Sequence, residues 1–185
     1  MEYCFLKEQI KYDGRQLSSH FAYKTFGLAG NSIVGFIGPV EVELSEMVDI
    51  EDVRAKEPIS SDRMLNLIVE VFDLDLHGAV WMQRLLMSKI ADELNRRLNG
   101  IKVLRKGDDL FFKERKLSVS IATASPVSVM VHSALNILPT GAPVPISCLQ
   151  EMKVEPVELA LSILESFAHE FDDIEFARVK VNWVM

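Results

Sequence analysis

Cysteines are scarce in this chain, and their scarcity limits the chemistry and the location that the sequence supports. Only Cys4 and Cys148 occur among the 185 residues. No disulfide framework is therefore expected, and both residues are expected to be free thiols in a reducing compartment. The first residues do not form a signal peptide, and no apolar run is long enough to cross a bilayer. These features predict a cytoplasmic protein without a membrane partner.

Basic side chains are also in the minority. The chain has 20 Lys and Arg against 27 Asp and Glu, a formal net charge of −7, so a broad surface that grips phosphate backbones is not expected and nucleic acid is not an expected partner. Arg96 and Arg97 are explained more simply as the last turn of a helix, whose dipole they complement. Motifs for zinc ligation and for a nucleophile elbow are missing, so the sequence predicts no metal site and identifies no cofactor.

Hydrophobic residues make up 49% of the chain, enough for one sizeable core, and no repeat or linker interrupts it. We expect a single domain over residues 1–185. In its first third, residues 21–26 and 32–37 are β-rich runs on either side of a glycine-containing turn, which predicts a hairpin. Gly38-Pro39 is expected to end the second strand, and residues 41–63 to form a long loop with one helical turn at most.

The rest of the chain alternates between strand and helix patterns. Residues 64–72 predict a buried strand, and residues 76–98 a helix with Asp75 as its N-cap and Gly100 as its stop. A helix is expected from Pro156 to residue 171. Four more strands, of which 127–137 is long, and an alternating C-terminal strand complete the pattern, at 101–105, 109–112, 116–123, 127–137 and 177–183. The predicted fold class is α+β, with a mixed, largely antiparallel sheet and helices packed on one side.

Two of these strands carry small or polar side chains on alternate positions. Lys116, Ser118 and Ser120 share one face of the first strand, and His132 and Asn136 share one face of the second. These faces could join as the floor of a ligand pocket, but a half-exposed sheet that meets solvent would give the same pattern. A lysine at a strand start is usually a solvated end, and His132 is better explained as a core histidine with a hydrogen-bond partner than as a base. Gly107-Asp108-Asp109 is most simply a hairpin turn, and its two carboxylates are weak evidence for a metal.

The segments from residue 101 onward resemble the biotin and lipoate protein ligases. After the buried strand and the long helix, Gly107-Asp108-Asp109 and Arg115-Lys116-Leu117 are similar to the Asn-Asp pair and the lysine strand of biotin protein ligases. Residues 131–137 resemble the His-Gly-x-Ala-Leu-Asn-Val segment of lipoate and octanoate transferases, and residues 145–149 resemble the Val-Thr-Ser-Leu that follows. The chain also looks like an uncharacterised prokaryotic family, a domain of unknown function, at the edge of this class II aminoacyl-tRNA synthetase-like superfamily.

This resemblance implies a biotin/lipoate ligase-like fold and a set of site residues. Lys116 corresponds to the lysine that contacts the acyl carbonyl, and it is the one catalytic residue implied. The expected ligand-binding residues are Asp108, Asp109 and Asn136 from the resemblance, together with Ser118, Ser120 and His132 from the polar strand faces. A small carboxylic-acid-like ligand is the expected partner, and a homodimer is an open option.

Two segments depart from the ligase and transferase patterns. Residues 56–63 contain no glycine where the ligases hold phosphates, and Glu57 and Asp62 would repel them. Residues 138–141 carry Thr140 where octanoyltransferases use a cysteine nucleophile. The sequence therefore supports acyl transfer or carboxylate activation on a small carboxylic acid. The alternatives are a non-catalytic module that binds a small molecule or a partner, and a plain interaction subunit.

Overall fold

A five-stranded mixed sheet forms the centre of the protein in a computed structural model that describes residues 1–56 and 59–184. Its strands lie in the order β1-β2-β3-β8-β7; β1 is parallel to β2 and every other pair is antiparallel. The strands are β1 (Glu2–Leu6), β2 (Ser32–Val42), β3 (Ile59–Phe72), β7 (Ser118–Ala124) and β8 (Ser128–Asn136). The predicted α+β fold class is confirmed.

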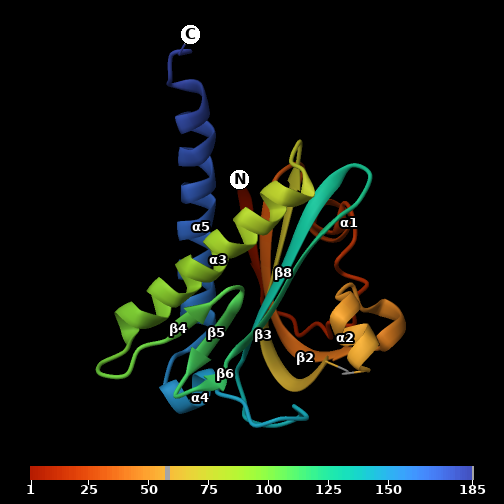
Figure 1. Ribbon diagram of the computed structural model, residues 1–185, viewed down its shortest axis with the longest axis vertical. Helices are drawn as coiled ribbons and strands as arrows, with labels where there is room; N and C mark the ends of the chain where they lie inside the picture. The colour runs from red at the N-terminus through yellow and green to blue at the C-terminus, as the bar shows by residue number, and fades with distance from the viewer. Residues whose placement is uncertain (57–58, 185) are drawn as a thin grey trace.

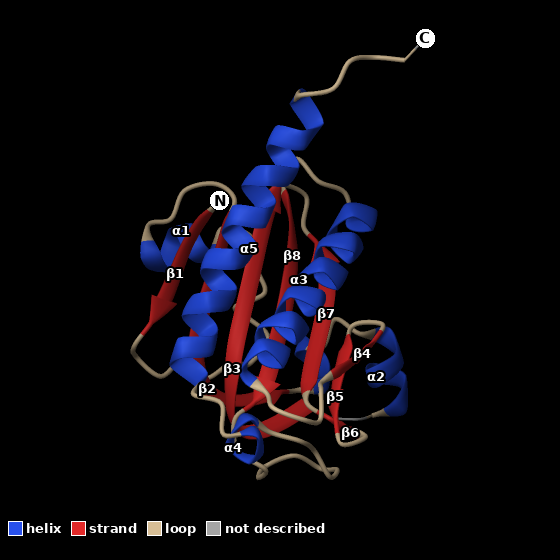
Figure 2. Cartoon of the chain, turned by 90° about the vertical axis from the view of Figure 1, so that its left-hand side faces the viewer, coloured by secondary structure: helices blue, strands red, loops and turns tan. Residues whose placement is uncertain are grey.

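Two long helices, α3 (Leu76–Arg97) and α5 (Pro156–Val179), cover one face of this sheet (Figures 1 and 2). Asp75 caps α3 as predicted, since its side chain accepts a hydrogen bond from the backbone N–H of Gly78 at 2.7 Å. Between the helices and the sheet lies the larger core, which includes Leu67, Leu86 and Leu164. No helix of the described residues is long and apolar enough to span a membrane.

The opposite face of the sheet carries shorter elements and a second core. These elements are α1 (Phe21–Phe26), the 3-10 helix η1 (Leu44–Glu46) and α2 (Ile50–Ala55). Tyr12, Phe36, Met64 and Ile68 belong to the core beneath them. A small sheet of β4 (Leu104–Lys106), β5 (Asp109–Phe112) and β6 (Arg115–Lys116) lies beside β7, and the short helix α4 (Leu149–Met152) precedes α5.

Two predicted strands are wrong: residues 21–26 form a helix, and of residues 177–183 the first three lie in α5 and the rest form no strand. Residues 21–26 form α1, which ends at Gly27; that glycine has φ +73°, its backbone N–H donates to the carbonyl of Tyr23 at 2.9 Å, and the N–H of Leu28 donates to that of Ala22 at 3.4 Å. The predicted hairpin therefore does not exist. At the other end, α5 continues to Val179 and projects beyond the sheet, so the alternating tail has no strand beside it (Figure 1). The tail is exposed, with Trp183 at 98%.

Gly38-Pro39 does not end β2 as predicted. The strand continues to Val42 through a register shift between Gly38 and Val40. At this point the segment before α1 approaches closely, because the backbone N–H of Tyr12 donates to the carbonyl of Pro39 at 2.9 Å. Proline is tolerated here because β1 pairs with β2 only as far as Phe36. The predicted loop at 41–63 is likewise too long, since it contains η1, α2 and the start of β3; Glu57 and Pro58 lie outside the described residues.

Candidate active site

A cavity of about 660 Å³ lies on the sheet face opposite α3 and α5. The sheet contributes one wall of the cavity, through Met64, Val119, Ile121 and His132. The segment that contains η1 and α2 contributes another wall. A volume of this size is typical of small-molecule sites. All seven residues that the sequence singled out line this cavity: Lys116, Asp108, Asp109, Ser118, Ser120, His132 and Asn136.

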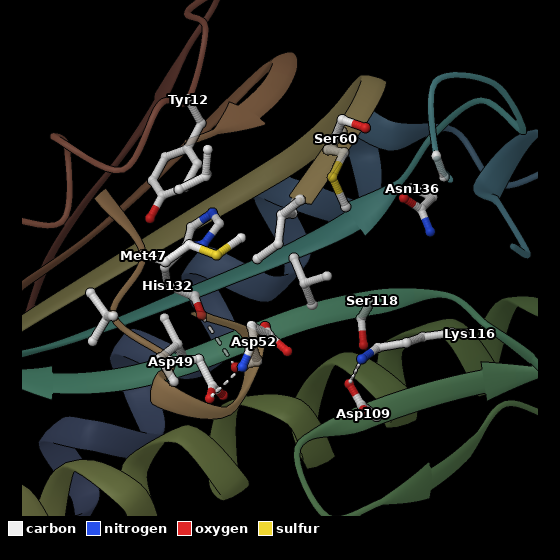
Figure 3. Close-up of a pocket in the computed structure, with 18 of the residues that line it drawn as sticks. Tyr12, Met47, Asp49, Asp52, Ser60, Asp109, Lys116, Ser118, His132 and Asn136 are labelled. Atoms are coloured by element: carbon white, nitrogen blue, oxygen red, sulfur yellow. Dashed lines mark hydrogen bonds and ion pairs between the residues drawn. The ribbon is translucent and has the colours of Figure 1, made fainter. Parts of the chain in front are cut away.

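Lys116 is held by the small sheet rather than by β7. It belongs to β6, where it pairs with Phe111 of β5, and its carbonyl accepts from the backbone N–H of Ser147 at 2.9 Å. Its Nζ lies 3.0 Å from Oδ1 of Asp109, and the side chains of the two residues are 44% and 29% exposed (Figure 3). The ammonium is thus partly shielded and positioned by a carboxylate at the cavity wall.

Asp108 connects the cavity to the long helix α3. Its carboxylate accepts from Nη1 of Arg84 at 2.8 Å and from Nε2 of Gln83 at 3.2 Å. The same Gln83 amide donates to Oγ of Ser120 at 3.1 Å. The β4–β5 hairpin predicted at Gly107-Asp108-Asp109 is confirmed, and these bonds fix its position relative to α3.

Ser118 and Ser120 border the cavity, but the strand register turns their side chains to the other face of the sheet, so the predicted joining of the two polar faces is wrong. Ser118 pairs with Leu135, and Ser120 pairs with Ser133, so both serines share the face that meets the helices. His132 pairs with Ile121 on the cavity face. Ser118 is fully buried and its Oγ accepts from the backbone N–H of Leu110 at 2.9 Å, which ties β7 to β5.

Asn136 and His132 stand on the cavity face of β8. The Asn136 side chain donates to the carbonyl of Ser147 at 3.3 Å and thereby holds the loop that precedes α4. His132 is 4% exposed, and its Nε2 lies 3.1 Å from Oδ1 of Asn66. Burial lowers the pKa of His132 to about 3, so the ring is neutral near pH 7. A core histidine with a hydrogen-bond partner, favoured from the sequence, is what the structure contains.

Sequence reasoning missed two residues beside His132. Tyr12 stacks on its ring with centroids 3.7 Å apart and 12° between the planes, and it also lines the cavity. Burial raises the pKa of the Tyr12 hydroxyl. Asn66 is fully buried in β3. A polar residue inside the apolar run at 64–72 was the available signal for Asn66, whereas no local pattern indicates Tyr12.

The cover over the cavity was also missed. It comes from the acidic segment of residues 44–56, in which Asp49 caps α2 by accepting from the backbone N–H of Glu51 at 2.8 Å. The residues that line the cavity carry more carboxylates than ammonium groups: Lys56 and Lys116 against Glu46, Asp49, Asp52, Asp108 and Asp109. The lining is therefore acidic on balance; because Asp108 and Asp109 are paired with Arg84 and Lys116, a negative potential is expected mainly near Glu46, Asp49 and Asp52.

The segment that the resemblance aligns with the phosphate loop of ligases lies partly in a strand. Lys56 ends α2 in a left-handed conformation with φ +56°, and β3 begins at Ile59, with a register shift relative to β2 between Ser61 and Met64. Ser60 lines the cavity and donates to the carbonyl of Gly141 at 2.8 Å. Over residues 59–63 the backbone is thus engaged in a strand and not free to wrap a phosphate.

Neither a metal site nor a cysteine nucleophile is apparent in this region. Within residues 1–56 and 59–184, no group of three or more His, Cys, Asp or Glu side chains is arranged to hold a metal. Of the described residues that line the cavity, none is a cysteine. Cys148 is a buried free thiol at the start of α4.

Comparison with solved structures places the fold among the protein ligases. A protein of unknown function from Pyrococcus horikoshi is 38% identical, has a TM-score of 0.94, and is matched over 100% of this chain and 99% of that one. A putative lipoate protein ligase from T. acidophilum, Ta0514, solved with bound lipoic acid, has a TM-score of 0.61 at 13% identity, over 93% and 87% of the two chains. A biotin protein ligase from Aquifex aeolicus in complex with biotin and ATP has a TM-score of 0.60 at 13% identity, over 91% and 69%. The scaffold is therefore ligase-like.

Sequence comparison identifies the family. "Uncharacterized protein MJ0805" of Methanocaldococcus jannaschii is 37% identical over 182 residues, which are 95% of this chain and 81% of that protein. The family model described as "Domain of unknown function (DUF366)" matches residues 1–182. The chain belongs to the DUF366 family, and its fold is that of the biotin and lipoate protein ligases.

Proposed function

We propose that this protein binds a small carboxylic-acid derivative in the cavity and transfers its acyl group, with Lys116 polarising the acyl carbonyl. One observation carries the proposal. The Nζ of Lys116 lies at the wall of a cavity of about 660 Å³, where Asp109 holds it at 3.0 Å. An ammonium group fixed in advance beside a reacting carbonyl is the usual means of stabilising a developing oxyanion.

The walls of the cavity favour a ligand with an apolar body. Many of the side chains that line the cavity are aliphatic or thioether groups: Val42, Met47, Val48, Ile59, Met64, Val119, Ile121, Val144 and Ile146. An acyl chain would be buried against these groups, and its carbonyl would lie near the ammonium. Such a mixture of apolar wall and few polar groups is typical of small-molecule sites.

The charges favour a neutral acyl derivative over a free acid or a nucleotide. Asp109 already pairs with Lys116, so a carboxylate ligand would have to compete with it. A neutral carbonyl needs only one of the three N–H donors of the ammonium and leaves the ion pair intact. The surplus of carboxylates around the cavity also repels a polyanion such as ATP.

The reaction that suits these groups is transfer from an activated acyl compound, such as a thioester. The nucleophile of an acceptor attacks the carbonyl carbon and forms a new bond. The carbonyl oxygen becomes an oxyanion next to Lys116. The carbon–sulfur bond then breaks, and the thiol departs with the proton that the acceptor loses. No nucleophile of the chain itself is needed, so the lack of a cysteine among the described cavity residues does not weaken the proposal.

A thermal-shift screen with ATP, biotin, lipoate, fatty acids and acyl thioesters tests the proposal. A compound present at a hundred times its Kd stabilises the folded protein by about 2.7 kcal/mol. For a chain of this length, that corresponds to a rise in Tm of roughly 5–10 °C. We expect acyl thioesters to produce such a shift and ATP to produce none. A rise in Tm with ATP alone would contradict the proposal. The absence of a rise with every acyl compound tested would contradict it as well.

A second candidate is a non-catalytic module that binds a small ligand on the same scaffold. The observation that favours it is that a strand begins at Ile59, in a segment without glycine that the resemblance aligns with the phosphate loop of ligases. Both candidates predict ligand binding in the cavity, but only the enzyme converts a thioester and a nucleophilic acceptor to products. The homodimer and the cytoplasmic location expected from the sequence remain predictions.

A further inference from the structure

Three polar side chains form a buried group in the cavity wall that the acyl-transfer proposal does not use. They are Tyr12, Asn66 and His132, which are 4%, 0% and 4% exposed. Tyr12 and His132 line the cavity, and Asn66 lies behind them in β3. Such a group in a region otherwise built from apolar side chains requires an explanation.

The hydrogen bonds of Asn66 determine which ring nitrogen of His132 carries the proton. The Asn66 amide nitrogen donates to the carbonyl of Met64 at 3.3 Å, so its Oδ1 is the atom that faces the histidine. This oxygen lies 3.1 Å from Nε2 of His132 and can only accept a hydrogen bond. Nε2 therefore carries the hydrogen, and in the neutral ring Nδ1 presents a lone pair.

The ring is also fixed in position. Tyr12 stacks on one face of it, and two hydrogen bonds hold the Tyr12 backbone against β2, because its N–H donates to the carbonyl of Pro39 at 2.9 Å and its carbonyl accepts from the N–H of Glu41 at 3.0 Å. Within the part of the chain that the structure describes, no side chain or backbone donor bonds to Nδ1. Nδ1 of His132 is therefore a fixed hydrogen-bond acceptor in the wall of the cavity, with no partner among the described residues.

We propose that His132 selects the ligand by accepting, through Nδ1, a hydrogen bond from a hydroxyl or N–H group on the acyl chain. This inference rests on the proposed acyl-binding function and names its substrate class, a short acyl group that carries a hydrogen-bond donor. The ligand would place its carbonyl at Lys116 and its donor at His132. Figure 3 draws these two residues toward opposite ends of the cavity, and both line it.

The chemistry of the neutral ring supports a donor on the ligand rather than an acceptor. Because burial keeps the imidazole uncharged, the ring does not attract an anionic group to this position. A site that buries an acceptor for a specific donor rejects analogues that lack the donor, since the acceptor is then left unpaired. An acyl chain without a hydroxyl or N–H group is therefore expected to bind less tightly.

Calorimetry with matched thioesters tests the inference. The probes are N-acetylcysteamine thioesters with acyl chains of four, six and eight carbons, each with and without a terminal hydroxyl. We expect the wild type to bind the hydroxylated member about tenfold more tightly at one chain length, as for one additional buried hydrogen bond. His132→Phe, which keeps an aromatic ring against Tyr12, should abolish this preference but still bind the plain thioesters.

Three results separate the possible failures. Equal affinity for both members at every chain length, or a preference that survives in His132→Phe, would overturn the inference and leave the acyl-binding function intact. Binding of no thioester, or binding that is unchanged in Lys116→Ala, would overturn the proposed function and the inference with it. If His132→Phe does not fold, the ¹⁵N signals of the wild-type imidazole replace it: Nδ1 must be unprotonated and must shift only with the hydroxylated ligand.

Discussion

Acidification is expected to destabilise the fold through His132. Burial lowers the pKa of this residue to about 3 in the folded protein, compared with 6.5 for an ordinary histidine. Between these two values the unfolded chain binds a proton that the folded chain excludes. The free energy of unfolding therefore falls as the pH falls from about 6.5 toward 3, and the contribution of the neutral ring is fully retained above 6.5.

The magnitude follows from the size of this gap. One pKa unit corresponds to about 1.4 kcal/mol, so lowering the pH from 7.5 to 5.5 should cost roughly 1 kcal/mol through this residue alone. Other groups titrate over the same interval, but they do so equally in wild type and in a His132→Phe variant. Denaturant unfolding of both proteins at the two pH values isolates the effect of His132 as the difference between their two pH dependences.

A matched control distinguishes burial from the mere loss of a histidine. His77 is exposed on α3 and contacts Trp81, with ring centroids 4.6 Å apart. His77→Phe should keep the pH dependence of the wild type, whereas His132→Phe should lose about 1 kcal/mol of it. If the unfolding free energies of wild type and His132→Phe change in parallel between pH 7.5 and 5.5, the buried neutral histidine is refuted.

The structure supports three further predictions. Gly38→Ala should lower the free energy of unfolding, measured by denaturant titration, by about 3 kcal/mol, because the new Cβ would lie 1.8 Å from the backbone oxygen of Ile10. In the control Gly35→Ala, in the same strand, the new Cβ meets only side-chain atoms, at 3.2 Å or more, so the loss should be smaller. Removal of residues 180–185 should change stability by no more than about 0.5 kcal/mol in thermal unfolding, since Val181, Trp183 and Val184 are 67%, 98% and 95% exposed; a larger loss would show that the tail packs against something. Calorimetry with ATP alone should give no low-micromolar affinity, and a binding free energy near −8 kcal/mol would contradict the negative potential inferred for the cavity.

The elements predicted well from the sequence are those whose own pattern decides their structure. The helix at 76–98 was recognisable from its apolar spacing and from Asp75, and the strand at 64–72 from its continuous apolar run. Residues 21–26 were predicted as a strand because aromatic and β-branched residues favour strands. Their helix is fixed by Gly27 and by the packing of Ala22 against the second core, which a local pattern does not contain.

The sequence identified which residues belong to the candidate site better than it predicted how their side chains are arranged. The ligase resemblance selected residues that all line one cavity, including Lys116 and the two adjacent aspartates. Alternation along one strand cannot predict which face joins which face of the next strand, because this depends on register. Here Ser120 pairs with Ser133 and not with His132. Tyr12 reaches His132 across 120 positions of sequence, and no periodicity predicts such a contact.

The role of Lys116 is tested most directly by one comparison of ligand binding and turnover. Lys113 provides the matched control, because its Nζ lies 3.1 Å from Glu151 and its side chain is 46% exposed, close to the 3.0 Å and 44% of Lys116, yet it does not line the cavity. Both alanine variants should unfold within about 0.5 kcal/mol of the wild type, since exposed ion pairs contribute little.

The decisive measurement is the rate of acyl transfer from a hexanoyl N-acetylcysteamine thioester, together with its Kd by calorimetry, for wild type, Lys116→Ala, Lys116→Arg and Lys113→Ala. The account predicts that Lys116→Ala lowers the rate by about 10²–10³, that arginine restores it only in part, and that Lys113→Ala has no effect. Weaker binding in Lys116→Ala without turnover by any of the proteins would support the non-catalytic module instead. Binding and turnover that are the same in Lys116→Ala as in the wild type would contradict the account.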